Sequence, residues 1–169
     1  MTDAFNLSIK KFDTKSIPEH PVVVCIAKRR SGKSFLIRDW LYQLRKRYTA
    51  GVVMSATEDG NRFYEKMGIP KAFIYTEFDE DALEKLVERQ RRATKKGVAK
   101  SVFVVLDDVA YNKSIFNKNV IRLLLMNGRH FKISVFLMLQ YALDTPPVGS
   151  SNFGPTSCTL TLTCASLVR

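Results

Sequence analysis

The chain has 169 residues, of which 46% are hydrophobic and 25% are charged, and its formal net charge is +11. This length favours a single domain, and the apolar content is sufficient for a hydrophobic core, which excludes a wholly disordered chain. The longest apolar runs, such as 102–106 and 135–139, are far shorter than the roughly 20 residues of a membrane span, so we expect no membrane segment.

The cysteines and the first residues favour an intracellular protein. Cys25, Cys158 and Cys164 are widely spaced and form no Cys-x-x-Cys pair, and two histidines are too few to complete a structural zinc site. Residues 1–6 show neither a basic nor a hydrophobic signal region. We therefore expect reduced thiols in a protein that is not secreted.

The positive charge is spread unevenly along the chain. Residues 1–50 carry a net charge of +7 and residues 109–169 carry +5, whereas residues 51–108 carry −1. A basic excess of this size favours a polyanionic partner, because lysine and arginine release counterions from nucleic acid. A protein that is simply basic is the alternative.

The first half of the chain predicts alternating strands and helices. Residues 1–21 are polar, end in prolines and predict an N-terminal extension. The apolar run 22–26 predicts a strand buried on both faces, and apolar residues at helical spacing predict a helix over 34–48. Further strands are predicted at 51–56 and 72–75, and Asp79 is the predicted N-cap of the following helix.

The second half continues this alternation. Strands are predicted at 102–106 and 133–139, separated by a helix over 118–127. The pattern indicates an α/β fold of three layers, with a mostly parallel central sheet flanked by helices. Leucine alternates with threonine over 159–163, so residues 148–169 form either one closing strand or a poorly folded tail.

Residues 27–34 match the P-loop pattern G-x-x-x-x-G-K-[ST], with Ala27 in place of the first glycine. Backbone N–H groups between a strand and a helix can surround phosphates there. Lys33 would reach the β- and γ-phosphates and Ser34 a magnesium ion. We expect alanine to be tolerated at position 27 if its φ is negative. The candidate nucleotide-binding residues are Ala27, Lys28, Arg29, Arg30, Ser31, Gly32, Lys33 and Ser34.

Polar residues at the ends of the later strands complete a candidate site. Asp107 and Asp108 follow an apolar strand, as in a Walker B element, so Asp107 is predicted to hold magnesium and Asp108 to orient or deprotonate water. Gln140 could position water or sense the γ-phosphate, and the alternative is a solvent-facing glutamine. Arg129 is a candidate arginine finger across a subunit interface, and the alternative is a plain helix-ending basic residue.

Together these motifs resemble those of the genome-packaging ATPases of nucleocytoplasmic large DNA viruses, poxvirus-type, within the FtsK–HerA branch of P-loop ATPases. The resemblance implies a P-loop ATPase domain over 22–147, which hydrolyses ATP with Mg²⁺ and moves double-stranded DNA into a capsid. It further implies a homo-oligomeric ring, viral capsid or portal proteins as partners, and a place in the host cytoplasm, the virus factory or the virion. The motifs that carry it are 26–34 with Arg38 and Asp39, 105–108, 124–130 and 138–141.

The chain departs from this family's pattern in two places. Asp108 stands where the wider superfamily usually has glutamate, and residues 149–169 match poorly, which indicates a diverged or truncated tail over 148–169. Two other functions are therefore considered. A small nucleoside or nucleotide kinase would need an arginine-bearing lid, yet the sequence after Gln140 offers only Arg169. A non-hydrolysing fragment of the packaging ATPase that binds nucleotide or DNA is the second alternative.

Overall fold

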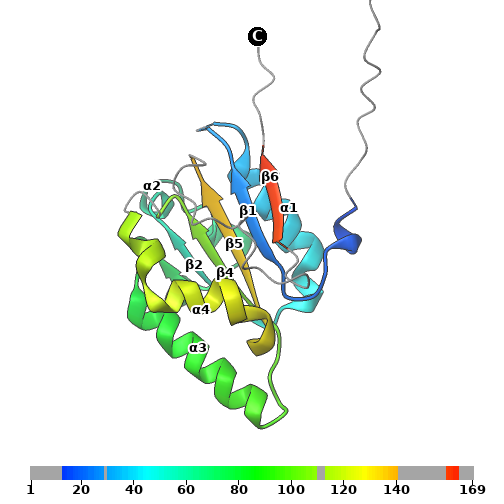
Figure 1. The fold of residues 1–169 in the computed structure, drawn as a ribbon. Helices are drawn as coiled ribbons and strands as arrows, with labels where there is room; N and C mark the ends of the chain where they lie inside the picture. The colour runs from blue at the N-terminus through cyan, green and yellow to red at the C-terminus, as the bar shows by residue number, and fades with distance from the viewer. Residues whose placement is uncertain (1–12, 29, 110–112, 141–158, 164–169) are drawn as a thin grey trace, which may run out of the picture.

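The computed structural model describes residues 13–28, 30–109, 113–140 and 159–163, which form an α/β fold around one six-stranded sheet (Figure 1). The strand order is β3-β2-β4-β5-β1-β6, and every pairing is parallel. The predicted α/β class and parallel sheet are thus confirmed. The strands are β1 (Val22–Ile26), β2 (Ala50–Ser55), β3 (Ile74–Tyr75), β4 (Val102–Asp107), β5 (Ile133–Leu139) and β6 (Thr159–Thr163).

The helices follow the predicted alternation, with differences at their ends. Asp79 is the N-cap of α3, because its Oδ1 accepts a hydrogen bond from the Ala82 N–H at 2.8 Å. The predicted 34–48 helix is wrong at its C-terminal end, where η2 replaces the last α-helical turn. The helices are α1 (Lys33–Leu44), α2 (Glu58–Asn61), α3 (Glu80–Lys95) and α4 (Asn119–Asn127), with 3₁₀ helices η1 (Thr14–Ser16), η2 (Arg45–Arg47), η3 (Glu65–Met67), η4 (Lys71–Phe73), η5 (Lys113–Asn117) and η6 (Gly128–Phe131).

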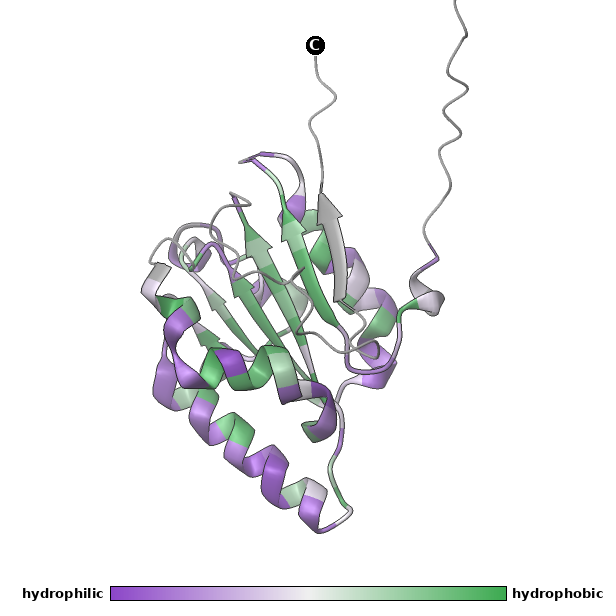
Figure 2. Ribbon diagram, viewed as in Figure 1, coloured by the Kyte–Doolittle hydropathy of each residue, from purple (hydrophilic) through white to green (hydrophobic). Residues whose placement is uncertain are grey.

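Helices cover both faces of the sheet and give three layers. α3 and α4 pack on one face, where Leu83 and Leu124 join a buried cluster with Val104. α1 packs on the other face, where Ile37 contributes to a second cluster with Val105. The strands form the most hydrophobic layer, whereas the outer side of α3 is hydrophilic (Figure 2). Burial of both faces explains why the strands appear in the sequence as continuous apolar runs. Among the described residues, no helix is long and apolar enough to cross a membrane.

β5 lies between β1 and β4, and this order brings the chain's motifs together. The Ala27 N–H after β1 donates to the Leu139 carbonyl at 3.0 Å, and the Asp108 N–H after β4 donates to the Met138 carbonyl at 3.4 Å. The last residues of β5 therefore hold the starts of both motif loops. β6 pairs with the side of β1 that faces away from β5 and is the outermost strand there.

A buried side chain on α3 holds the segments that precede β4 and β5. The Gln90 amide donates to the Lys100 carbonyl at 2.8 Å and to the Phe131 carbonyl at 3.0 Å. We expect Gln90→Leu to lower the free energy of unfolding by about 1–3 kcal/mol, because both carbonyls lose their donor. Urea denaturation measures this loss, and Arg89→Ala, at the exposed neighbouring position, is the control. Equal stability of the Gln90→Leu and Arg89→Ala variants would contradict the assignment.

Candidate functional site

The described residues between β1 and α1 end at a helix N-terminus that has no side-chain cap. Gly32 is the N-cap of α1 with φ 88°, a conformation that favours glycine, and no side chain of the described residues caps the first turn. The N–H groups of that turn are therefore available to an anion. Ala27 is buried and is absent from the residues with positive φ, so alanine at this position imposes no backbone strain.

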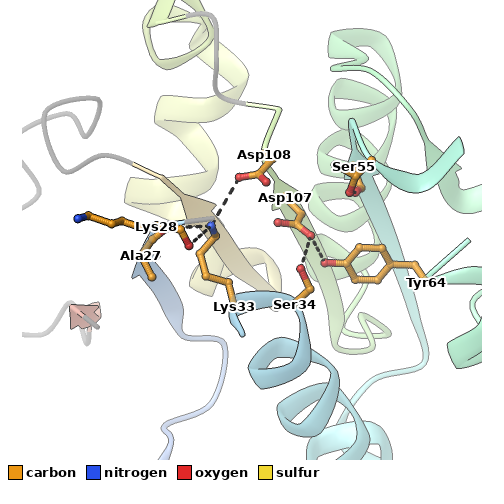
Figure 3. A network of polar contacts seen from close by, with 9 residues as sticks. Ala27, Lys28, Lys33, Ser34, Ser55, Tyr64, Asp107 and Asp108 are labelled. Carbon is orange, nitrogen blue, oxygen red and sulfur yellow. Dashed lines mark hydrogen bonds and ion pairs between the residues drawn. The ribbon is translucent and has the colours of Figure 1, made fainter. Parts of the chain in front are cut away.

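Not all the predicted loop residues lie against this geometry. Lys28, Arg30 and Ser31 are exposed, and the Lys28 side chain points away from the other labelled residues in Figure 3. Arg30 has φ 59°, an unusual conformation for a residue with a Cβ. Arg29 lies outside the described residues. The N–H groups of the first turn of α1, more than the described basic side chains, are therefore the donors that this segment offers.

Lys33 joins the loop to the carboxylates after β4. Its Nζ donates to the Ala27 carbonyl at 2.8 Å and to the Lys28 carbonyl at 3.5 Å, and it lies 3.9 Å from Asp108 Oδ1. Only 7% of Lys33 is exposed. A buried ammonium group requires such acceptors, because burying a charge without partners is costly. The predicted P-loop lysine and the second Walker B carboxylate are therefore neighbours.

Asp107 and Ser34 form an oxygen-rich site next to Lys33 (Figure 3). The Ser34 hydroxyl donates to Asp107 Oδ2 at 3.4 Å, and Asp107 is only 2% exposed. Within the described part of the chain, Asp107 Oδ1 is buried and accepts no hydrogen bond. Magnesium commonly takes one or two carboxylates together with hydroxyl, water and phosphate oxygens. The side chains present therefore fit a magnesium ion, with Oδ1 as the available oxygen.

The electrostatic environment of Asp107 is unfavourable to its charge. Burial raises the pKa of this carboxyl above its ordinary value, and the nearby Asp108 raises the pKa further. The hydrogen bond from Tyr64 and the charge of Lys33 oppose this shift. A cation at the site would relieve the same penalty, since it favours the ionised form.

Tyr64 and Glu58 belong to this site, although the sequence analysis named neither of them. The Tyr64 hydroxyl donates to Asp107 Oδ2 at 2.8 Å, and burial raises the pKa of this hydroxyl far above its ordinary value. The Glu58 carboxylate is buried and accepts the N–H groups of Tyr64 at 3.0 Å and Glu65 at 2.9 Å. One signal was present: the chain leaves β2 at the same edge as Asp107 and is polar there, with Ser55, Thr57 and Glu58.

Asp108 and Gln140 end neighbouring strands at this edge. Asp108 has φ 54°, and 22% of its side chain is exposed. The carboxylate that pairs with the buried Lys33 is therefore partly accessible to solvent. Gln140 directly follows β5 and is half-buried, and β5 lies between β1, which leads to the P-loop, and β4, which precedes Asp108. The topology places both where the sequence predicted, while their roles toward water stay predictions.

Arg129 is not brought to this site. It lies in η6, which precedes β5, whereas the P-loop follows the carboxyl ends of the parallel strands. With a strand rise of about 3.3 Å per residue, the length of β5 separates the two by roughly 20 Å. An Arg129 finger would therefore have to act on another subunit, as the prediction required, and that role stays a prediction.

The chain is similar in sequence to several viral proteins. No family model matches it. It is 36% identical over 163 residues to the uncharacterized protein 075L of Invertebrate iridescent virus 6, covering 90% of this chain and 62% of that protein. It is 33% identical over 155 residues to the uncharacterized protein L437 of Acanthamoeba polyphaga mimivirus, covering 86% of this chain and 54% of that protein. The chain thus spans between half and two thirds of the length of these relatives.

Among solved structures, the fold resembles that of the genome-packaging NTPase B204 from Sulfolobus turreted icosahedral virus 2, in complex with AMPPCP. The TM-score is 0.53 at 20% identity, covering 78% of this chain and 70% of that one. At this identity the likeness concerns the fold. It agrees with the three-layer P-loop architecture expected from the sequence.

The raised pKa of Asp107 leads to a stability prediction. A carboxyl whose folded-state pKa is raised stabilises the fold below its unfolded pKa and loses that contribution as the pH rises through the folded pKa. We expect Asp107→Asn to raise the free energy of unfolding at pH 7 by about 0.5–2 kcal/mol, and the gain to disappear below about pH 4. Urea denaturation at both pH values measures it, with Asp59→Asn, at an exposed position, as the control. A destabilised Asp107→Asn variant at pH 7 would contradict this account.

Proposed function

We propose that this chain is an ATPase that uses Mg²⁺ and couples ATP hydrolysis to the movement of double-stranded DNA into a viral capsid. The observation that carries the proposal is the meeting of Lys33, Ser34, Asp107 and Asp108 at one edge of the sheet, beside an uncapped helix N-terminus. The fold likeness to a genome-packaging NTPase and the relatives in large DNA viruses support the biological setting.

In this proposal the loop binds the phosphates of ATP through its backbone N–H groups, and Lys33 turns from the Ala27 carbonyl to the β- and γ-phosphates. Asp107 and Ser34 would hold magnesium. When bound, the metal ion neutralises charge on the phosphate oxygens. The chain's own contribution is a buried, rigid set of oxygen ligands.

Hydrolysis requires a water molecule aligned with the γ-phosphorus. Gln140 would orient this water, and the exposed part of Asp108 would accept its proton. The water oxygen forms a bond to phosphorus while the bond to the β–γ bridging oxygen breaks, which yields ADP and phosphate. Lys33 beside Asp108 stabilises the negative charge that develops during this transfer.

The remaining assignments concern the assembly. Residues 22–147 would form the ATPase domain, with 1–21 as an extension and 148–169 as a diverged tail that contributes the closing strand β6. The net charge of +11 supports contact with DNA phosphates. Arg129 would act as a finger on a neighbouring subunit of a homo-oligomeric ring. Capsid or portal proteins would be further partners, in the cytoplasm, the virus factory or the virion.

The site assignment predicts the effect of removing Lys33. We expect Lys33→Ala to abolish ATP turnover, because no other buried cation of the described residues lies at this edge. Phosphate release measures turnover, and Lys46→Ala, at an exposed lysine beyond the same helix, is the control. Wild-type-like hydrolysis by Lys33→Ala would refute the site. ATP binding without hydrolysis by the unsubstituted chain would instead favour the non-hydrolysing alternative.

The DNA assignment predicts a strong dependence on salt. We expect duplex DNA to stimulate hydrolysis and to bind with an affinity that falls steeply as salt rises, by about 0.9 logarithmic units per phosphate contact for each tenfold increase. Fluorescence anisotropy with a labelled duplex measures the slope. Lys33→Ala should keep the same slope while showing no stimulated hydrolysis. Binding that does not change with salt would count against the motor function.

A further inference from the structure

We infer that Tyr64 is a positioning residue that orients the Asp107 carboxylate, so that Oδ1 faces the bound magnesium ion. This inference rests on the proposed function, since it assigns a residue to the metal site of that function. It concerns a side chain from the segment after β2, which none of the P-loop or Walker B motifs contains.

The contacts of Asp107 divide its two oxygens. Oδ2 accepts from the Tyr64 hydroxyl at 2.8 Å and from the Ser34 hydroxyl at 3.4 Å, whereas Oδ1 has no partner among the described residues. Two donors on one oxygen fix the rotation of the carboxylate about its Cβ–Cγ bond. The unpartnered oxygen is then held in one direction, just as hydrogen bonds to a metal-binding side chain hold its ligand atom in place.

Tyr64 is itself fixed by its surroundings. Glu58 accepts its backbone N–H, and the Phe63 ring packs edge-on against the Tyr64 ring at a centroid distance of 5.2 Å. Tyr64 is only 1% exposed. A continuous series of contacts therefore runs from the Glu58 carboxylate through Tyr64 to Asp107, and it joins the loop after β2 to the end of β4. Figure 3 shows the last of these contacts, from Tyr64 to Asp107.

Packing alone does not account for this arrangement. A phenylalanine would fill nearly the same volume without a hydroxyl, and a neutral residue at position 107 would avoid burying a charge. The Tyr64 hydroxyl and the Asp107 carboxylate are nevertheless both buried, and the hydroxyl donates to the carboxylate. Their common effect is to keep an ionisable carboxylate oriented at the end of β4, where a metal ion would need it.

The test compares the Mg²⁺ dependence of nucleotide binding in the full chain. Isothermal titration calorimetry gives the dissociation constant of AMPPCP in EDTA and over a series of Mg²⁺ concentrations. We expect Tyr64→Phe to raise the Mg²⁺ concentration for half-maximal binding by about 10–100-fold, and to leave binding in EDTA unchanged. Tyr48→Phe is the matched control, because it removes a tyrosine hydroxyl elsewhere in the structure, where the ring packs edge-on against Phe103 and Phe136.

A second variant keeps the Tyr64 hydroxyl but changes the Glu58 carboxylate that accepts the Tyr64 backbone N–H. Glu58→Gln replaces one of the two oxygens that accept the N–H groups of Tyr64 and Glu65, so we expect a shift of the same sign and smaller size. It supplies the test if Tyr64→Phe does not fold, as judged by thermal unfolding. If AMPPCP binding by the unsubstituted chain depends on Mg²⁺ and the folded variants show the same dependence, the role of Tyr64 is overturned while the proposed metal site stands. Binding by the unsubstituted chain that ignores Mg²⁺ or is absent overturns the proposed metal site, and this inference with it.

Discussion

The arrangement of the site depends on the burial of opposite charges at the end of an apolar sheet. Lys33 and Asp107 are almost completely removed from solvent, and neither could remain there as an isolated ion. Asp108 lies beside Lys33, and hydroxyl groups lie beside Asp107. The apolar clusters on both faces of the sheet provide the stability that offsets the cost of burying these charges.

Residues with positive φ also gather at the carboxyl ends of the strands, where these charges lie. Gly32, Asp108 and Arg30 all have positive φ and lie in the loops that follow β1 and β4. Backbone strain of this kind persists only where the surrounding structure determines it, and it is frequent at functional sites. At the opposite ends of β4 and β5, the buried Gln90 of α3 instead bonds to the carbonyls of Lys100 and Phe131.

Much of the fold could be predicted because its signals are local. A parallel strand buried on both faces appears as an apolar run, and β4 and β5 therefore matched their predicted ranges closely. The N-cap of α3 was recognisable from Asp79 alone. The loop of 27–34 could be recognised because its glycine, lysine and serine lie within a few residues and would serve one ligand in the proposed function.

Other features arise only from contacts between distant segments. No local pattern indicated that β5 lies between β1 and β4, since strand order depends on how the connections cross the sheet. Tyr64 could not be recognised, because its partner Asp107 is 43 positions away in the sequence. The distance of Arg129 from the P-loop follows from the same topology. Short elements such as η2 and η4 were missed, because a change from an α-helix or strand to a 3₁₀ turn leaves the hydrophobic pattern nearly intact.

In the proposed function, an anion that binds the loop would take the place of the Ala27 carbonyl as the acceptor of the Lys33 hydrogen bond. The ammonium group already has an internal acceptor, so an arriving anion must replace a carbonyl oxygen and cannot simply fill an empty space. Such a replacement changes the free energy only by the difference between two hydrogen bonds of the same ammonium group, each of which contributes about 1.5–3 kcal/mol. The same bond joins the two ends of the loop, so in the proposed function the anions selected would be those that are better acceptors than this peptide carbonyl.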